Sequence, residues 1–93
     1  MMANPSEDKI LDEILPWLNQ KIQVKKEGIT PATELITDNL IDSMEFLEMV
    51  SFLEEKFNIE LDPDVLTPEN FKTPMTVASM VAASLDKHPD LNQ

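Results

Sequence analysis

The chain has 93 residues, and its 18 acidic residues outnumber seven lysines to give a formal net charge of −11. This charge excludes a basic surface for nucleic acid, and the absence of cysteine excludes a disulfide framework and a thiolate metal site. No stretch approaches the about 20 apolar residues of a membrane span. The N-terminus does not resemble a signal peptide, so we expect a cytoplasmic protein without membrane insertion.

The first predicted helix covers residues 7–24. Ser6 is its expected N-cap, followed by acids that suit the first turn of a helix. Pro16 lies inside this helix and has no backbone N–H, so we expect either a kink near residues 12–16 or two separate helices. Apolar residues recur at helical spacing along it: Leu11, Ile14, Leu15, Leu18 and Ile22.

A long loop is predicted over residues 25–41, where Gly28 and Pro31 interrupt any regular structure. The loop contains too many apolar residues to remain exposed to solvent, so we expect it to pack onto the helices. Its apolar residues are Ile29, Leu35, Ile36, Leu40 and Ile41.

The second predicted helix begins after Asp42 and ends near Phe57, where Asn58 can stop it. Asp42 and Glu45 have the spacing of a capping box, in which each side chain accepts from the other residue's backbone N–H. The remaining spacing predicts an inward stripe, with Phe46 and Met49 on its shoulders. This stripe consists of Leu47, Val50, Leu53 and Phe57.

Three cap-and-proline pairs organise the rest of the chain. Asp62-Pro63 and Thr67-Pro68 predict one or two short helical turns between residues 62 and 71. Thr73-Pro74 begins a last helix that runs to about residue 86. Its apolar spacing is carried by Val77, Met80, Val81, Ser84 and Leu85.

The expected fold is therefore all-α: a small bundle of three main helices, with one or two short turns and a long first loop. We expect one domain over residues 7–86, between flexible tails at 1–6 and 87–93. One core should be shared by all the main helices. Its expected members include Leu15, Leu47, Val50, Leu53, Val77 and Val81.

Catalytic and metal sites are hard to find in this sequence. The only histidine, His88, stands in the C-terminal tail, so no imidazole is expected to activate a serine or threonine as a nucleophile. Asp62 begins a segment like a calcium-binding loop, but Thr67 and Thr73 stand where the EF-hand pattern needs glycine and glutamate. We therefore expect no metal and no enzymatic activity.

Ser43 is the remaining candidate for chemistry. It is expected to be the first residue of the second helix, where a phosphate ester would meet unpaired N–H groups and a favourable helix dipole. With no base or thiol beside it, Ser43 suits modification by another enzyme. The alternative on these residues alone is that Asp42-Ser43 is simply a good helix start.

The segment 40–44, Leu-Ile-Asp-Ser-Met, resembles the attachment motif of acyl and peptidyl carrier proteins. The likeness extends to segments 29–35, 53–61 and 71–77, and it covers residues 7–86 in all. One departure is Asn39, which stands where many members have glycine. Since asparagine tolerates positive φ better than most residues, the turn can survive this change.

This resemblance implies a carrier that holds an acyl or aminoacyl group as a thioester on 4′-phosphopantetheine, attached covalently to Ser43 from coenzyme A. Asp42 would complete the motif and cap the helix. Expected partners are a phosphopantetheinyl transferase, an acyl- or aminoacyl-activating ligase, and a downstream transferase or synthase. Segment 63–73 looks more like D-alanyl and other specialised stand-alone carriers than like fatty-acid carriers.

A docking face is expected on the second helix, beginning beside Ser43. Ten acids and one lysine lie between residues 38 and 69, so a basic partner would be attracted. We expect the carrier to be a monomer. The alternatives are an acidic helical interaction module without a prosthetic group and, more remotely, a small hydrolase using Ser43. The predicted docking residues are Ile41, Met44, Glu45, Glu48, Ser51 and Glu55.

Overall fold

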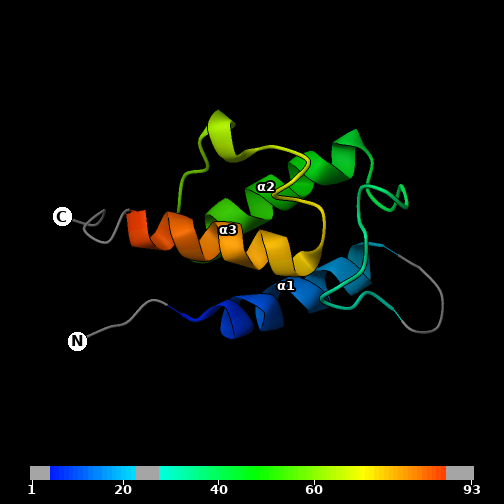
Figure 1. The fold of residues 1–93 in the computed structure, drawn as a ribbon, viewed down its shortest axis with the longest axis horizontal. Coiled ribbons are helices and arrows are strands. Elements are labelled where there is room, and N and C mark those ends of the chain that lie inside the picture. The colour runs from blue at the N-terminus through cyan, green and yellow to red at the C-terminus, as the bar shows by residue number, and fades with distance from the viewer. Residues whose placement is uncertain (1–4, 23–27, 88–93) are drawn as a thin grey trace.

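The computed structural model describes residues 5–22 and 28–87, and within them it contains helices and no strands. The main elements are α1 (Glu7–Lys21), α2 (Ser43–Phe57) and α3 (Pro74–Lys87), with a short 3₁₀ turn η1 (Pro63–Val65) between the last two. The predicted all-α bundle is confirmed (Figure 1). His88 and most of the predicted tails lie outside the described residues.

Helix α1 runs without interruption through Pro16, so the alternative of two separate helices is wrong. Pro16 and Asp12 are both exposed, and the carbonyl of Asp12 that loses its helical partner can therefore meet water. Ser6 caps the helix, as predicted, by accepting from the backbone N–H of Lys9 at 3.3 Å. The helix ends at Lys21 rather than near residue 24, which is outside the described residues.

The loop from residue 28 to the start of α2 is tied to α1 and to the segment just before α3. The side-chain amide of Asn19 on α1 bonds both backbone groups of Ile29, at 2.7 and 3.2 Å. The N–H of Leu35 donates to the carbonyl of Lys72 at 2.7 Å. Ile29 and Leu35 are buried, which confirms that the loop packs onto the helices. Asn39 has φ 55°, so this asparagine adopts the positive φ for which glycine is otherwise best suited.

Three of the four residues in the predicted inward stripe of α2 lie in or against the core, and one does not. Met49 and Leu53 are fully buried, Val50 and Phe57 are half-buried, and Leu47 is 64 % exposed. The expectation that Leu47 belongs to the core is wrong. The inward side of α2 is formed by Met49 and Leu53, and Phe46, Val50, Phe52 and Phe57 pack against the core as partly buried residues.

Two aromatic contacts fix this rotation of α2. Phe46 meets Phe71 edge-on, with ring centroids 4.8 Å apart, and Phe52 stacks on Trp17 of α1 at 4.8 Å. Both contacts join α2 to residues distant in sequence. Apolar residues occur on several sides of α2, so helical spacing alone could not show that Leu47 faces outward.

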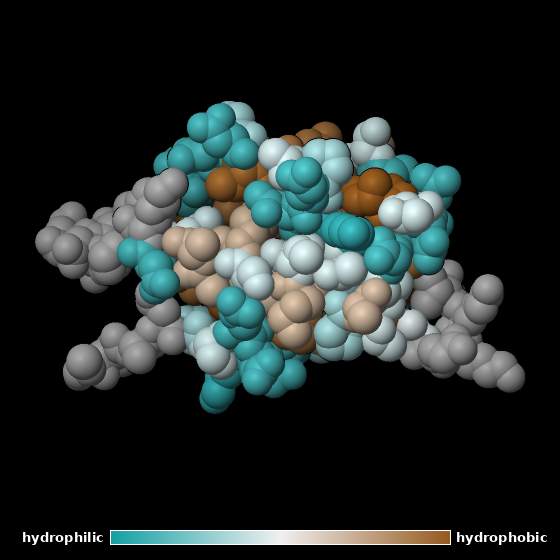
Figure 2. Space-filling model, in the orientation of Figure 1, coloured by the Kyte–Doolittle hydropathy of each residue, from teal (hydrophilic) through white to brown (hydrophobic). Residues whose placement is uncertain are grey.

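Helix α3 completes the core. Thr73 and Thr76 cap its start reciprocally, since each backbone N–H donates to the other residue's hydroxyl, at 3.0 and 3.2 Å. Val77 and Val81 are fully buried, as predicted, against α1 and α2. The outward side of α3 is weakly polar, and apolar residues on this face of the molecule form small separate patches (Figure 2).

Candidate functional site

Ser43 is the first residue of α2, and its side chain is exposed to solvent. No described side chain hydrogen-bonds to it, and no described residue is a histidine or cysteine that could activate it. A modifying enzyme can therefore reach the hydroxyl, while the protein itself offers little to activate it.

The predicted capping box is confirmed in both directions. The N–H of Glu45 donates to Asp42 Oδ1 at 2.8 Å, and the N–H of Asp42 donates to Glu45 Oε1 at 3.1 Å. Of the N–H groups at this helix end, those of Ser43 and Met44 have no partner within the described residues. The cap thus leaves two donors next to the Ser43 hydroxyl, where an anionic ester would be stabilised.

The side of α2 that leads away from Ser43 carries exposed apolar and acidic residues. Met44 is 70 % exposed and Leu47 is 64 % exposed, so two large apolar side chains on this helix contribute to the surface. The spacing of four of these residues is visible in the sequence, but Leu47 is missed there because helical spacing places it in the core. We call this set the exposed side of α2: Met44, Leu47, Glu48, Ser51 and Glu55.

Two of the predicted docking residues lie outside this set. Glu45 is half-buried and one of its carboxylate oxygens accepts from Asp42, so it serves the helix cap. Ile41 is half-buried and packs against the core beside Ser43.

An open hollow of about 450 Å³ begins at Ser43. It lies between the start of α2, Ile36 of the first loop, and residues 66–68 after η1. Its walls are mostly apolar, and they include Ile41, Phe46 and Leu47. A flexible group attached to the Ser43 hydroxyl could rest here with its apolar part out of water.

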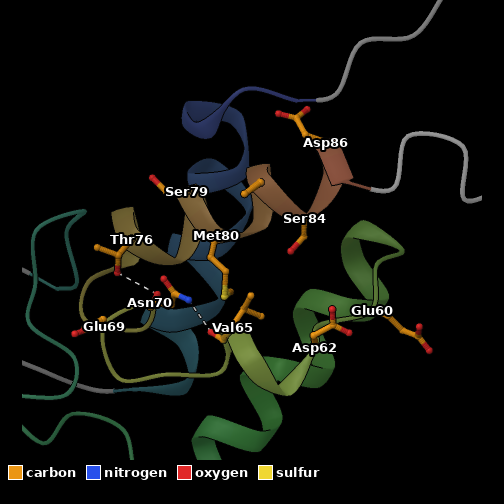
Figure 3. Close-up of a pocket in the computed structure, with 11 residues that line it drawn as sticks. Glu60, Asp62, Val65, Glu69, Asn70, Thr76, Ser79, Met80, Ser84 and Asp86 are labelled. Atoms are coloured by element: carbon orange, nitrogen blue, oxygen red, sulfur yellow. Dashed lines mark hydrogen bonds between the residues drawn. The ribbon is translucent and has the colours of Figure 1, made fainter.

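A larger cavity of about 630 Å³ lies elsewhere, between α3 and residues 60–70. Figure 3 shows Asn70 at its wall, where the Asn70 amide donates to the carbonyl of Val65 and the Thr76 hydroxyl donates to the carbonyl of Asn70. These bonds hold the segment after η1 against α3. Ser43 does not line this cavity, so the hollow at Ser43 is a separate feature.

Neither a membrane helix nor a metal cluster is found in the described part of the chain. None of its helices is long and apolar enough to cross a membrane. Across residues 5–22 and 28–87, no three His, Cys, Asp or Glu residues are grouped so that they could hold a metal ion.

The fold is a small acidic helical bundle with an exposed serine at a helix start, and known proteins with similar sequences are acyl carrier proteins. The chain is 34 % identical over 55 residues to the acyl carrier protein of Helicobacter pylori, covering 59 % of this chain and 69 % of that protein. It is 36 % identical over 55 residues to the acyl carrier protein of Wolinella succinogenes, covering 59 % and 71 %. A probable acyl carrier protein, PigG, from a Serratia strain is 26 % identical over 84 residues, covering 90 % and 92 %.

No protein-family model matches the chain. The similarity to the two acyl carrier proteins is nevertheless sufficient, and the chain belongs to the acyl carrier protein family. The predicted carrier role is thereby confirmed. The names of these relatives do not address an aminoacyl cargo, so that subtype stays a prediction.

Proposed function

We propose that Ser43 carries 4′-phosphopantetheine, joined through a phosphate ester to the serine hydroxyl, and that the protein presents an acyl or aminoacyl cargo on this arm. The observation that carries the proposal is the exposed Ser43 hydroxyl at the start of α2, beside two backbone N–H groups that lack a partner within the described residues. A phosphate ester at a helix start is favoured by such donors and by the helix dipole.

The arm would supply the thiol that this chain lacks, so that a cargo could be held on it as a thioester. The protein's own contribution is to hold Ser43 on a rigid helix end and to offer the hollow beside it. Tethering also raises the effective concentration of the cargo at each partner enzyme. The carrier itself would catalyse no bond formation, and we place it in the cytoplasm, where coenzyme A-dependent activation would occur.

We also propose that the exposed side of α2 is the docking surface for these enzymes. It begins at the attachment residue, so a partner bound there would reach the arm. Its carboxylates, Glu48 and Glu55, would attract a basic partner and speed association without demanding tight binding. Expected partners are a phosphopantetheinyl transferase, an activating ligase and a downstream transferase or synthase.

The test is modification with coenzyme A and a broad-specificity phosphopantetheinyl transferase, followed by mass spectrometry. The wild-type chain should gain one phosphopantetheine, and Ser43→Ala should gain none while it keeps its helical circular dichroism. Ser79→Ala, on α3 and away from the proposed docking surface, is the matched control and should be modified normally. A wild-type chain that stays unmodified by several transferases would favour the interaction module without a prosthetic group.

The cargo is a separate question with its own measurement. We expect an aminoacyl or specialised acyl group, because segment 63–73 resembles that of D-alanyl and related carriers. Mass spectrometry of the protein isolated from its native host would show the attached group directly. An ordinary fatty acyl chain on the arm would contradict the aminoacyl expectation and leave the carrier role intact.

A further inference from the structure

The exposed side of α2 is one wall of a groove whose other wall belongs to α1. The groove has a volume of about 450 Å³, and Trp17 and Lys21 of α1 line it together with Phe52 and the exposed side of α2. The stacked rings of Trp17 and Phe52 lie at the junction of the two helices. A partner that docks beside Ser43 would therefore meet α1 as well as α2.

Lys21 is the basic side chain in this acidic groove. Its Nζ lies 3.4 Å from Glu48 Oε1 and 5.7 Å from the centroid of the Trp17 ring. The cation is thus held both by a carboxylate and by the face of an aromatic ring. Both partners of the ion pair remain close to half exposed, at 43 % and 45 %, so the pair can open without exposing a buried charge.

We infer that Lys21 is an internal competitor for the docking surface: it occupies Glu48 in the free carrier and gives way to a basic side chain of the partner. The occupant we assign to the groove is a transferase or ligase surface that pairs a Lys or Arg with an adjacent apolar side chain. Charge complementarity supports this choice, since Glu48 and Glu55 outnumber Lys21 among the charged residues of the groove, while Met44 and Leu47 offer apolar contact. The inference rests on the proposed carrier function.

Such a competitor has a clear physical consequence. The ion pair with Glu48 must open before the partner's cation can take its place, so part of the docking free energy is offset. Weaker docking speeds release, which suits a carrier that must visit several enzymes in turn. Lys21 would then tune affinity without touching the cargo.

A second ion pair of the same kind provides a matched control. Lys56 Nζ lies 3.1 Å from Glu13 Oε1, again between α2 and α1, with side-chain exposures of 46 % and 49 %. Neither Lys56 nor Glu13 lines the groove. Lys21→Gln and Lys56→Gln each change the formal net charge from −11 to −12, so any difference between them reports local pairing and not total charge.

The experiment measures kcat/KM for modification of Ser43 by a phosphopantetheinyl transferase at low and at physiological salt. Lys21→Gln should raise kcat/KM about 1.4- to 5-fold at low salt, mainly through a lower KM, because an exposed pair of this kind is worth about 0.2–1 kcal/mol. Lys56→Gln should change it much less. In a Glu48→Gln background, Lys21→Gln should give no acceleration, because the carboxylate for which Lys21 and the partner compete is absent.

Trp17, the chain's only tryptophan, gives a readout that does not depend on turnover. Its single indole N–H signal in an ¹⁵N-labelled carrier should shift when unlabelled transferase is added without coenzyme A. The shift should saturate at lower transferase concentration for Lys21→Gln than for Lys56→Gln.

Equal kcat/KM values for the two variants, or a slower Lys21→Gln, would overturn the inference, and the slower result would mean that Lys21 itself contacts the partner. These outcomes require only that the wild type is modified, so they leave the proposed function standing. Failure of the wild type to accept phosphopantetheine on Ser43 would instead reject the proposed function, and the competitor role with it.

Discussion

The two sides of helix α2 differ in how far their apolar side chains are exposed to solvent. On the inward side of α2, Met49 and Leu53 have no exposed surface. On the other side, Met44 and Leu47 are 70 % and 64 % exposed, although they are as apolar as the residues inside. Burial in this helix therefore follows position relative to the rest of the fold rather than residue type.

The largest expected effect is on the free energy of unfolding, which should fall after truncation of a leucine on the inward side and hardly change on the outward side. Leu53→Ala should lower the free energy of unfolding by about 2–5 kcal/mol, because it opens a cavity in a packed core. Leu47→Ala removes the same atoms from an exposed position and should change it by about 0.5 kcal/mol or less. Thermal and urea unfolding followed by circular dichroism would measure both. Equal losses would mean that Leu47 is buried in solution and that the two sides are not distinct.

A smaller effect should appear in kinetics on the outward side only. Glu48→Lys replaces an attractive charge with a repulsive one and places two lysines side by side, so modification of Ser43 should slow several-fold, mainly through association. Glu13→Lys makes the same charge change away from the groove and is the control. The wild-type rate should also fall with salt, since the Debye length is about 8 Å at physiological ionic strength. Equal slowing by both variants would mean that the rate of Ser43 modification depends on total charge and not on the exposed side of α2.

The capping box at the start of α2 gives a third prediction, on the free energy of unfolding. Asp42→Ala removes the acceptor of the Glu45 N–H and should cost about 1 kcal/mol of unfolding free energy. Asp42→Asn keeps an acceptor oxygen at the same position and should recover most of this loss. Chemical denaturation of the two variants measures the difference, and a full loss in Asp42→Asn would show that charge rather than the hydrogen bond stabilises the helix start.

The last prediction concerns the end of α2, where one of the two variants should have almost no effect. Asn58 adopts φ 56° and ψ 52°, a left-handed conformation that glycine takes without strain. Asn58→Gly should therefore stay within about 0.5 kcal/mol of the wild type in unfolding free energy, while Asn58→Ala should be destabilised by about 1 kcal/mol or more. Urea denaturation of the two variants checks this order. If alanine were tolerated as well as glycine, α2 would end differently in solution.

Much of this protein is determined by the sequence itself, because the signals involved are local. Asp42 and Glu45 specify a helix start through bonds between residues three apart, and Asn58 specifies its end through its own backbone conformation. Prolines after Asp62 and Thr73 set the later boundaries in the same way. The position of Ser43 at a helix N-terminus therefore follows from the residues on either side of it.

Only the tertiary structure decided how the helices are rotated and what lies opposite them. Helical spacing places Leu47 in the core, and the contacts of Phe46 with Phe71 and of Phe52 with Trp17 set a rotation of α2 that leaves it outside. The pairing of Lys21 with Glu48 likewise joins residues 27 positions apart, so no local pattern could reveal it. Helix boundaries depend on bonds within a turn or two, whereas the orientation of an amphipathic helix depends on the partners that cover it.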